Sequence, residues 1–465
     1  EGPGSQTGNP ARSPGSKRQE DLRMGGNTWE EVLLVSEAEI TRAVQAQYET
    51  FPYPPIPYDR PFEGFSSLGS YTLAQYARTR RLQEPAGARF LVAGCGTGWE
   101  VHGIAASNPG YGSVVGIDIS RPALEIAQKR IKHHGLRNCS VQYGDLMDPS
   151  TWPEGSFDMI SSYGVIHHTA DPVKALRNLA SRLAADGVMA LMLYNRSGRW
   201  HLYRIRRALE LLGITPPATP EKIEFVRQLL KAAHPTSMLA QHAKAHQDYY
   251  LHDENIVDNF FHANDIPFDI GEIPDLLAQA GLEFIDVAPY SDYWNARPLI
   301  AATHPEFHRR YEALARIDQL RVMEYLEPLY HTQNLFWCCH QGKKVDHWDP
   351  FTVEFFKGSR WQLNPLFVRY GSVRYWDQKI PFSDLLGKLD PAQILTQKMD
   401  IFWPVARIPG KMMASTRYQV VELLLPLANQ ARSGAEILAA HEERADHLLN
   451  LFRQWEADRL VLRVA

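Results

Sequence analysis

The sequence contains little cysteine, with four residues in a chain of 465. Cys338 and Cys339 are adjacent inside an apolar run, and adjacent cysteines rarely form a disulfide because the geometry is strained. Free, buried thiols are typical of a reducing compartment. The cysteine content therefore predicts a cytoplasmic protein whose thiols are not paired.

Long apolar runs and an excess of one charge are also absent. No stretch approaches 18 apolar residues, and the N-terminus has no apolar signal core. The formal net charge is -4, which gives no argument for a nucleic-acid or membrane surface. We therefore expect a soluble protein that needs neither a membrane nor nucleic acid.

The chain is long enough for more than one folded unit, since it has 465 residues of which 44% are hydrophobic. Its first 28 residues are rich in Gly, Ser, Pro and Arg, which predicts a disordered tail. We expect an N-terminal helix and a Pro/Tyr-rich segment over 29–80. A cofactor-binding domain over 81–345 follows, with a helical insertion at 199–262, and a second domain covers 346–465.

The most informative segment joins an apolar strand to a glycine-rich turn. Phe90-Leu91-Val92-Ala93 precedes Gly94-Cys95-Gly96-Thr97-Gly98, and a second apolar strand ends at Asp118. Glycines let the backbone turn sharply and approach a ligand, because no Cβ stands in the way. A carboxylate at the tip of the next strand can accept both hydroxyls of a ribose. The segment therefore predicts a site for a nucleotide-like cofactor.

The glycine spacing separates two kinds of cofactor. A dinucleotide fingerprint reads G-x-G-x-x-G, whereas this turn reads G-x-G-x-G. No basic residue follows the turn to meet a phosphate, and Glu100 is acidic instead. This favours a cofactor with an amino-acid tail and no phosphate.

Further strands follow in the order of a parallel α/β sheet. The apolar pattern predicts strands at 139–143, 157–162, 188–194, 283–287 and 334–340, and helices at 36–49, 199–233 and 304–328. An amphipathic helix that begins at Asp171-Pro172 is expected to present Leu176, Leu179 and Leu183 on one face. These elements predict a seven-stranded sheet that closes near residue 342.

The motifs in these elements resemble those of the class I S-adenosylmethionine (SAM) methyltransferases. Gly94–Gly98 resembles motif I, the Phe157-Asp158-Met159-Ile160 run resembles motif IV, and Tyr163–Thr169 is close to the family's G-V-L-H-H run. The resemblance implies a Rossmann-like α/β fold with a mostly parallel seven-stranded sheet. It implies SAM as cofactor, bound by Gly94, Cys95, Gly96, Gly98, Asp118, Ile119, Asp145, Leu146 and Tyr163.

The sequence indicates the residues that bind the methyl acceptor less specifically than those that bind the cofactor. Open α/β sheets bind ligands at the carboxyl ends of their strands, which makes Tyr163, His167 and His168 the candidate catalytic residues. A similar Q-Y-E-x-x-P-Y-P segment precedes the SAM domain in a group of bacterial methyltransferases. This segment is interpreted as a rigid linker packed on the core, as a lid over the pocket, or as both. The expected acceptor-pocket residues are Tyr48, Tyr53, Tyr194, Asn195, Tyr250 and His252.

Histidines gather in the insertion and raise the question of a metal. His242 and His246 are four residues apart on a possible helix, and His252-Asp253 follows. A zinc site needs a tighter ligand set and supporting hydrogen bonds. We therefore expect no metal there, and interpret Tyr250, His252 and Asp253 as polar contacts of a lid.

The C-terminal unit reads as α+β. Residues 366–370 and 373–376 flank a Gly-Ser turn and predict a hairpin. Helices are expected at 420–428, from Ser433, and at 447–458, before a strand at 460–464. This order resembles the small winged-helix domains attached to some peptide-modifying enzymes. The last helices are net acidic, which argues against DNA binding.

The sequence thus predicts a SAM-dependent methyltransferase. Its acceptor atom could be N, O, S or C, on a small molecule or on a peptide or protein, and a homodimer is possible. An inert SAM-binding scaffold in a modification complex is the alternative of another class. A nicotinamide oxidoreductase is disfavoured by the glycine spacing and by Asp145.

Overall fold

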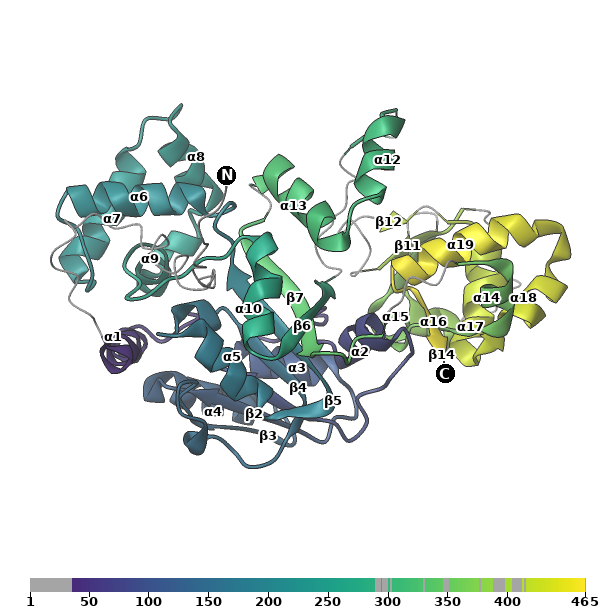
Figure 1. Cartoon of the computed structure of the whole chain (residues 1–465), viewed down its shortest axis with the longest axis horizontal. Coiled ribbons are helices and arrows are strands. Elements are labelled where there is room, and N and C mark those ends of the chain that lie inside the picture. The colour runs from purple at the N-terminus through teal and green to yellow at the C-terminus, as the bar shows by residue number, and fades with distance from the viewer. Residues whose placement is uncertain are drawn as a thin grey trace, which may run out of the picture.

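The computed structural model describes residues 36–288, 294, 300–301, 303–328, 331–345, 351–375, 378–387, 398–403, 412–413 and 415–464. A seven-stranded sheet in the order β3-β2-β1-β4-β5-β7-β6 lies at its centre (Figure 1). β7 is antiparallel to β5 and β6, and the other neighbours are parallel. The strands are β1 Arg89–Ala93, β2 Ser113–Asp118, β3 Cys139–Tyr143, β4 Phe157–Tyr163, β5 Leu183–Tyr194, β6 Leu282–Val287 and β7 Gln333–His340. The Rossmann-like sheet is confirmed.

Helices cover both faces of this sheet, because alternate strand residues point to opposite sides. They are α2 Tyr71–Thr79, α3 Trp99–Ser107, α4 Arg121–His133, α5 Pro172–Ala180, α10 Ile273–Gln279 and α13 Arg316–Leu326, whereas α12 Pro305–Glu312 projects away from the sheet (Figure 1). Phe90 and Val92 of β1 share a core with residues of α2, α3 and α4. Leu91 and Ala93 share the other core with residues of α5, α10 and α13. Burial on both faces explains why the central strands read as unbroken apolar runs.

Two helices that follow strands begin at polar caps. The Ser120 side chain accepts the N–H of Ala123 at 3.2 Å at the start of α4, and Asp171 caps α5 in the same way. The expected apolar face of the helix after Asp171 is wrong at one position. α5 ends at Ala180, and Leu183 instead begins β5, where it pairs with Phe157.

A helical insertion lies between β5 and β6, as expected. It contains α6 Trp200–Leu211, α7 Pro220–Ala232, α8 Met238–Ala245, η3 Tyr249–Leu251 and α9 Asp253–Phe260. Leu202, Leu209, Val226 and Phe260 belong to a core of its own, and Phe51 packs against that core. Phe51 follows α1 Glu37–Thr50, which begins at a capping box of Ser36 and Glu39. The chain before the sheet thus contacts the insertion after it.

The C-terminal unit contains two small sheets and short helices. Its sheets have the orders β10-β9-β11-β12 and β13-β8-β14. The strands are β8 Arg360–Leu363, β9 Ser372–Tyr375, β10 Gln378–Pro381, β11 Asp400–Phe402, β12 Met412–Met413, β13 Arg432–Ser433 and β14 Val461–Val464. The helices are α14 Val353–Gly358, α15 Pro365–Tyr370, α16 Phe382–Gly387, the π-helix η8 Tyr418–Leu424, α17 Leu425–Asn429, α18 Gly434–Ala440 and α19 Ala445–Ala457. Short 3-10 turns are η1 Pro149–Thr151, η2 Ile166–His168, η4 Ile270–Glu272 and η9 Glu442–Arg444.

The expected hairpin at 366–376 is wrong. Asn364 caps a helix by accepting the N–H of Leu366 at 2.9 Å, and Pro365 occupies the first turn, so α15 forms instead. β9 then pairs with β10 and β11. The predicted helices and final strand at the chain end are confirmed as η8, α17, α18, α19 and β14. The resemblance to a winged helix stays a prediction.

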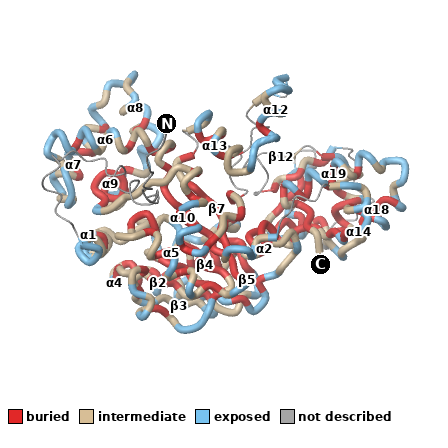
Figure 2. Tube along the Cα trace, in the orientation of Figure 1, coloured by how far each residue is buried: buried red, intermediate tan, exposed pale blue. Residues whose placement is uncertain are grey.

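The C-terminal unit continues the core of the sheet. One cluster of buried residues includes Leu73 of α2, Met159 of β4, Trp361 of β8 and Val461 of β14. Figure 2 shows the buried tube running from the sheet through α2 into this unit. The Tyr370 hydroxyl donates to the carbonyl of Ala106 at 2.6 Å. The two units are therefore packed against each other.

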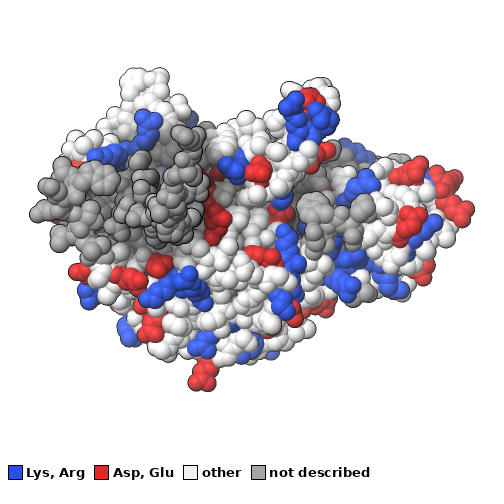
Figure 3. Space-filling model, viewed as in Figure 1, with Lys and Arg blue, Asp and Glu red and all other residues white. Residues whose placement is uncertain are grey.

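The surface of the described chain shows no extended field of one sign on the visible face. Lys and Arg are interspersed with Asp and Glu there (Figure 3). Acidic side chains gather at the far end of the C-terminal unit, where η9 and α19 carry Glu442, Glu443 and Asp446. None of the helices in the described ranges combines the length and the apolar character that crossing a membrane requires. The predicted disordered tail at 1–28 lies outside the described residues.

Candidate functional site

The turn between β1 and α3 has the left-handed backbone expected of its glycines. Gly94, Gly96 and Gly98 have φ angles of 78°, 49° and 81°. A Cβ on Gly96 would lie 2.2 Å from the carbonyl oxygen of Tyr53, and one on Gly94 would lie 2.3 Å from Val165 Cγ2. Neither position has room for a side chain.

Asp118 ends β2 beside this turn. Its Oδ2 accepts the N–H of Gly96 at 2.7 Å, and its Oδ1 accepts the N–H of Ser120 at 2.8 Å. Each oxygen keeps a further lone pair, so the carboxylate can still accept both hydroxyls of a ribose. Burial raises the pKa of Asp118, while these backbone hydrogen bonds act in the opposite direction.

Asp145 and Leu146 follow β3 at the same edge of the sheet. The Asp145 carboxylate accepts the N–H of Met147 at 2.8 Å, which orients it, and Leu146 is buried. Both line the same cavity as the glycine turn. A carboxylate beside an apolar side chain suits the amino group and the flat face of an adenine.

This cavity has a volume of about 1400 Å³ and extends from the glycine turn to the helical insertion. Sites for single small ligands are typically about 300–1,000 Å³, so the cavity has room for a cofactor and a second molecule. The expected cofactor-binding residues that line it are Gly94, Cys95, Gly96, Asp118, Ile119, Asp145, Leu146 and Tyr163. The expected acceptor residues that line it are His168, Tyr48, Tyr53, Tyr194 and Tyr250.

The Pro/Tyr-rich segment lies against the glycine turn. The carbonyl of Tyr53 accepts the N–H of Thr97 at 3.0 Å, and the carbonyl of Pro54 accepts the Thr97 hydroxyl at 2.8 Å. The hydroxyl of Tyr53 is 2.9 Å from that of Tyr249 in the insertion. The segment thus packs on the core and also lines the cavity, which combines the two interpretations given above.

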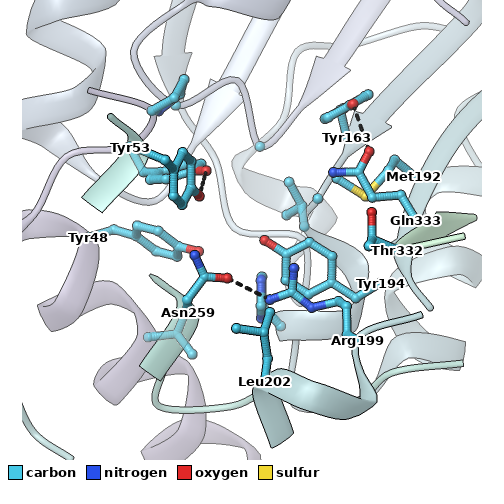
Figure 4. A pocket seen from close by; sticks show the side chains of 18 of the residues that line it. Tyr48, Tyr53, Tyr163, Met192, Tyr194, Arg199, Leu202, Asn259, Thr332 and Gln333 are labelled. Atoms are coloured by element: carbon cyan, nitrogen blue, oxygen red, sulfur yellow. Dashed lines mark hydrogen bonds between the residues drawn. The ribbon is translucent and has the colours of Figure 1, made fainter. Parts of the chain in front are cut away.

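Two tyrosine hydroxyls point toward one another across the cavity (Figure 4). Tyr194, at the end of β5, donates to Asp258 Oδ2 at 2.9 Å. The hydroxyl of Tyr48, on α1, lies 2.9 Å from Nε2 of His262. Burial and the nearby Asp258 raise the pKa of both phenols well above the usual value. Both tyrosines therefore keep their protons at neutral pH.

A stack of buried histidines stands behind these tyrosines. The rings of His168 and His262 are 3.6 Å apart between centroids, and those of His167 and Tyr194 are 4.1 Å apart. His168 Nδ1 donates to the carbonyl of Asn264 at 2.8 Å, so its Nε2 carries the lone pair. Burial lowers the pKa of all three histidines, so the stack is neutral at physiological pH.

Among the described residues, two groups contain possible metal ligands: His167 with His168 and Asp265, and His168 with Asp258 and His262. Within each group, the ligand atoms lie within 4.8 Å of one another. His262 Nδ1 accepts the N–H of Asn264 at 3.1 Å, and His167 Nδ1 accepts the N–H of Tyr194 at 3.4 Å. The Nε2 atoms of both rings therefore carry protons and offer no lone pair to a metal. This pattern fits a hydrogen-bonded network better than a metal centre.

The residues first considered for zinc lie apart from these groups. His242 hydrogen-bonds the Tyr250 hydroxyl at 2.8 Å, and His246 Nδ1 donates to the carbonyl of His242 at 2.9 Å. His252 is exposed at the start of α9, and Asp253 pairs with Arg227. Both residues are exposed, and neither His252 nor Asp253 lies in the cavity wall.

Other expected site residues also have different roles. Asn195 is fully buried outside the cavity, where it donates to Glu324 at 2.5 Å and to Asn334 at 2.9 Å. His167 is fully buried behind Tyr194 and does not line the cavity. Gly98 caps α3, and a Cβ there would meet Ala127 at 2.8 Å, so it serves helix packing.

Several residues of the site were not predicted from the sequence. Asp258 lies in α9 and His262 follows two residues after the end of that helix, and they hold the hydroxyls of Tyr194 and Tyr48 without lining the cavity themselves. Arg199 and Asn259 were likewise not singled out. The i, i+4 pair of an acid and a histidine was the available signal, but nothing local shows that it faces Tyr48 and Tyr194.

Known proteins resemble the part of the chain that contains the glycine turn. Residues 91–189 match the family model for a methyltransferase domain. An uncharacterized protein of Synechococcus sp. is 28% identical over 295 residues, 62% of this chain and 69% of that protein. A ubiquinone biosynthesis O-methyltransferase of Vibrio campbellii is 27% identical over 142 residues, 30% of this chain and 58% of that enzyme. The chain thus spans less than two thirds of that enzyme.

Solved structures show the same fold over most of the chain. PKMT2 from Rickettsia typhi has a TM-score of 0.53 and 16% identity, and the match covers 87% of this chain and 78% of that one. PKMT2 has also been solved in complex with AdoHcy. At this identity the likeness concerns the fold alone.

The fold and the carboxylates at its strand ends define a Rossmann-type enzyme that binds a nucleoside cofactor. The family match narrows the class: residues 91–189 belong to a SAM-dependent methyltransferase domain, and S-adenosylmethionine is its cofactor. The residues fit that cofactor, because Asp118 keeps lone pairs for a ribose and lines the same cavity as the glycine turn, Asp145 and Leu146.

Proposed function

We propose that this methyltransferase transfers the methyl group to a hydroxyl oxygen of a small molecule with an apolar body. The observation that carries the proposal is the pairing of Tyr48 and Tyr194, whose hydroxyls point toward one another beside the cofactor site (Figure 4). Tyr48 presents a hydrogen-bond donor to the cavity, and Tyr194 presents an acceptor. Both assignments follow from the hydrogen bonds that the two hydroxyls make with the protein.

Tyr48 presents a donor. Because His262 Nδ1 accepts a backbone N–H, its Nε2 carries the proton and donates to the oxygen of Tyr48 at 2.9 Å. The hydroxyl proton of Tyr48 is then directed away from His262. Tyr194 presents an acceptor, because its own proton is donated to Asp258 at 2.9 Å. Its oxygen lone pairs are free for a ligand.

An alcohol or phenol matches this pair. Its hydroxyl donates to Tyr194 and accepts from Tyr48 with one lone pair, while the second lone pair remains for attack on the methyl group. A neutral amine has a single lone pair, which a hydrogen bond from Tyr48 would occupy. The pair therefore favours oxygen over nitrogen as the acceptor atom.

The proton has a path away from the acceptor. Bound SAM supplies a methyl group that is already activated on its sulfonium sulfur. When the acceptor oxygen takes the methyl group from that sulfur, Tyr194 would accept the hydroxyl proton and pass its own proton to Asp258 Oδ2. The Pro/Tyr-rich segment and the insertion both line the cavity around this site. S-adenosylhomocysteine and the methyl ether are the products.

The far wall of the cavity favours an apolar acceptor. It is formed by apolar side chains of the insertion, among them Leu202, Ile205, Ala208, Leu229 and Leu239. The similarity to an O-methyltransferase of ubiquinone biosynthesis over 30% of this chain agrees with a hydroxyl acceptor. These two features extend the proposal from the acceptor atom to the body of the molecule.

A peptide or protein side chain is the second candidate. Leu212 and Met238 both line the cavity and are each 61% exposed, so its rim is apolar and open to the surface. Such a rim can contact a larger partner. Amine or peptide methylation without hydroxyl methylation would favour this candidate.

Methyl transfer from labelled SAM to panels of phenols, alcohols, amines and peptides tests the proposal. With a hydroxyl substrate, Tyr194→Phe should lower kcat about 100-fold or more, since general base catalysis contributes about 10²–10⁴-fold. Tyr48→Phe should also lower the rate. Tyr111→Phe is the control, because the Tyr111 hydroxyl bonds the carbonyl of Arg137 away from the cavity. An unchanged rate in Tyr194→Phe would remove its assigned role.

A further inference from the structure

Arg199 is a buried cation in the cavity wall. It is 6% exposed, and its guanidinium carbon lies 3.6 Å from the centre of the Tyr194 ring. Its Nη2 donates to the neutral amide oxygen of Asn259 at 2.9 Å, as Figure 4 shows. Its Nε is buried and has no hydrogen-bond partner.

The neighbouring arginines differ in their partners. Arg196 pairs with Asp269 at 2.9 Å, Arg206 pairs with Asp265 at 2.7 Å, and Arg227 pairs with Glu224 at 2.9 Å. Within the described chain, Arg199 has no carboxylate at ion-pair distance. Asp258 and Asp265 act on its charge only from beyond ion-pair distance. A buried guanidinium without a direct ion-pair partner is costly, so Arg199 has the capacity to meet an anion from outside the chain.

A second polar group lies on the same wall. His201 lines the cavity two residues further along the chain, and its buried Nδ1 has no hydrogen-bond partner. The ring of His201 is 4.9 Å from that of His242, which also lines the cavity. Guanidinium and imidazole N–H groups are the donors that carboxylate and phosphate groups prefer.

We propose that Arg199 and His201 bind an anionic substituent of the acceptor, so that the substrate is an acidic hydroxyl compound. The proposal rests on the proposed function, because it places the anion next to the hydroxyl held by Tyr194. Arg199 stacks on the same ring whose hydroxyl contacts the acceptor oxygen. The anion and the methylated hydroxyl therefore belong to one compact molecule, such as a hydroxy-substituted aromatic acid.

Calorimetric titration of the AdoHcy-loaded enzyme tests this with matched probes. 4-Hydroxybenzoate and 4-hydroxyphenyl phosphate carry an anion, and 4-hydroxybenzamide is a neutral analogue of the first. The wild-type enzyme should bind one of the two anions at least about tenfold more tightly than the amide, as expected for a hydrogen bond to a charged group. The anion that binds more tightly shows whether the substituent is a carboxylate or a phosphate. No preference over the amide would overturn the proposal.

Variants assign the preference to Arg199. Arg199→Gln should remove the preference for the anion while changing affinity for the amide by less than about twofold. Arg199→Lys, which keeps the charge, should retain part of the preference for the anion. Arg207→Gln is the control, since Arg207 pairs with Glu210 on the same helix and does not line the cavity. If Arg199→Gln loses affinity equally for the anion and for the amide, the role of Arg199 is structural.

Two further outcomes are informative. If Arg199→Gln weakens binding of AdoHcy itself, then Arg199 holds the carboxylate of the cofactor and the proposal fails. Because these titrations measure binding without methyl transfer, they separate the two proposals. Tight binding of the anion without methylation of its hydroxyl would leave the anion site standing and remove the hydroxyl as acceptor.

Discussion

At the scale of single residues, Glu100 shows how burial sets the protonation of an acid in the cofactor site. It lies in the first turn of α3 and lines the cavity, and Ser161 donates to it at 3.1 Å. Burial raises the pKa of Glu100 from 4.5 to about 7, since the charged form is kept from water. Between these pH values the folded protein binds a proton that the unfolded chain releases. Its contribution to stability therefore falls as the pH rises from about 4.5 to 7.

We predict that SAM binding releases this proton. SAM carries positive charge, which favours the carboxylate form of a neighbouring acid. With a pKa of about 7, the affinity for SAM should rise about tenfold from pH 6 to pH 8. Calorimetry in two buffers of different ionisation enthalpy measures the released proton. Glu100→Gln should flatten the profile, and an equally steep profile in that variant would assign the proton to another group.

Asp118 gives a second prediction at this scale. In Asp118→Asn, one oxygen is replaced by an NH₂ group that opposes either the N–H of Gly96 or that of Ser120. We expect SAM to bind about 10–100-fold more weakly, as for the loss of hydrogen bonds to a charged group. Titration with SAM checks this. Asp148→Asn is the control, because Asp148 is exposed and only caps η1. Equal affinity in Asp118→Asn and wild type would contradict the ribose role.

Residues of the site differ in how far the sequence could predict them. Gly96, Asp118 and Asp145 were predictable because contiguous motifs place each at a strand end. Asp258 and His262 were not, because their roles depend on how the insertion folds back over β5 and α1. His252 was expected in the pocket but is exposed at the start of α9, because its sequence neighbours do not show which side of that helix faces the cavity.

At the scale of elements, the Pro/Tyr-rich segment is held by the glycine turn. Thr97 bonds the carbonyls of Tyr53 and Pro54, and Tyr53 reaches Tyr249 of the insertion. The segment thus connects the cofactor turn to the acceptor wall. The hairpin expected at 366–376 failed at the same scale, because the cap at Asn364 favoured a helix over the apolar alternation.

We predict that Gly96→Ala displaces this segment. The new Cβ would lie 2.2 Å from the carbonyl oxygen of Tyr53, so the segment must move and SAM affinity should fall at least about tenfold. Gly135→Ala is a matched control. Gly135 has a φ of 59° with nothing within 4 Å of its Cβ, so it carries the backbone strain of about 1–2 kcal/mol without the clash.

Limited proteolysis and SAM titration check this prediction together. Gly96→Ala should expose residues 51–58 to cleavage, whereas Gly135→Ala should not. If both variants lose SAM affinity equally, the strain of the backbone rather than the position of the segment is responsible.

At the scale of the whole molecule, the C-terminal unit and the sheet share one core through α2. Glu456 of α19 is 2% exposed and accepts from Tyr76 at 2.8 Å and from Arg80 at 2.8 and 3.0 Å. The N–H of Leu82 also donates to the carbonyl of Arg463 in β14 at 2.8 Å. The sequence boundary near residue 345 therefore does not separate two independent cores, because apolar composition cannot show which units share buried surface.

We predict that Glu456→Gln destabilises the cofactor site as well as the C-terminal unit. Removing the charge breaks the buried ion pair between Glu456 and Arg80, and breaking such a pair costs about 3–5 kcal/mol. Denaturant unfolding should show one transition, followed equally by tryptophan fluorescence and by loss of SAM binding, at a lower midpoint than wild type. Glu442→Gln, an exposed residue of η9, should leave the midpoint unchanged. Two separate transitions, with SAM binding retained after the first, would show that the C-terminal unit folds independently of the methyltransferase domain.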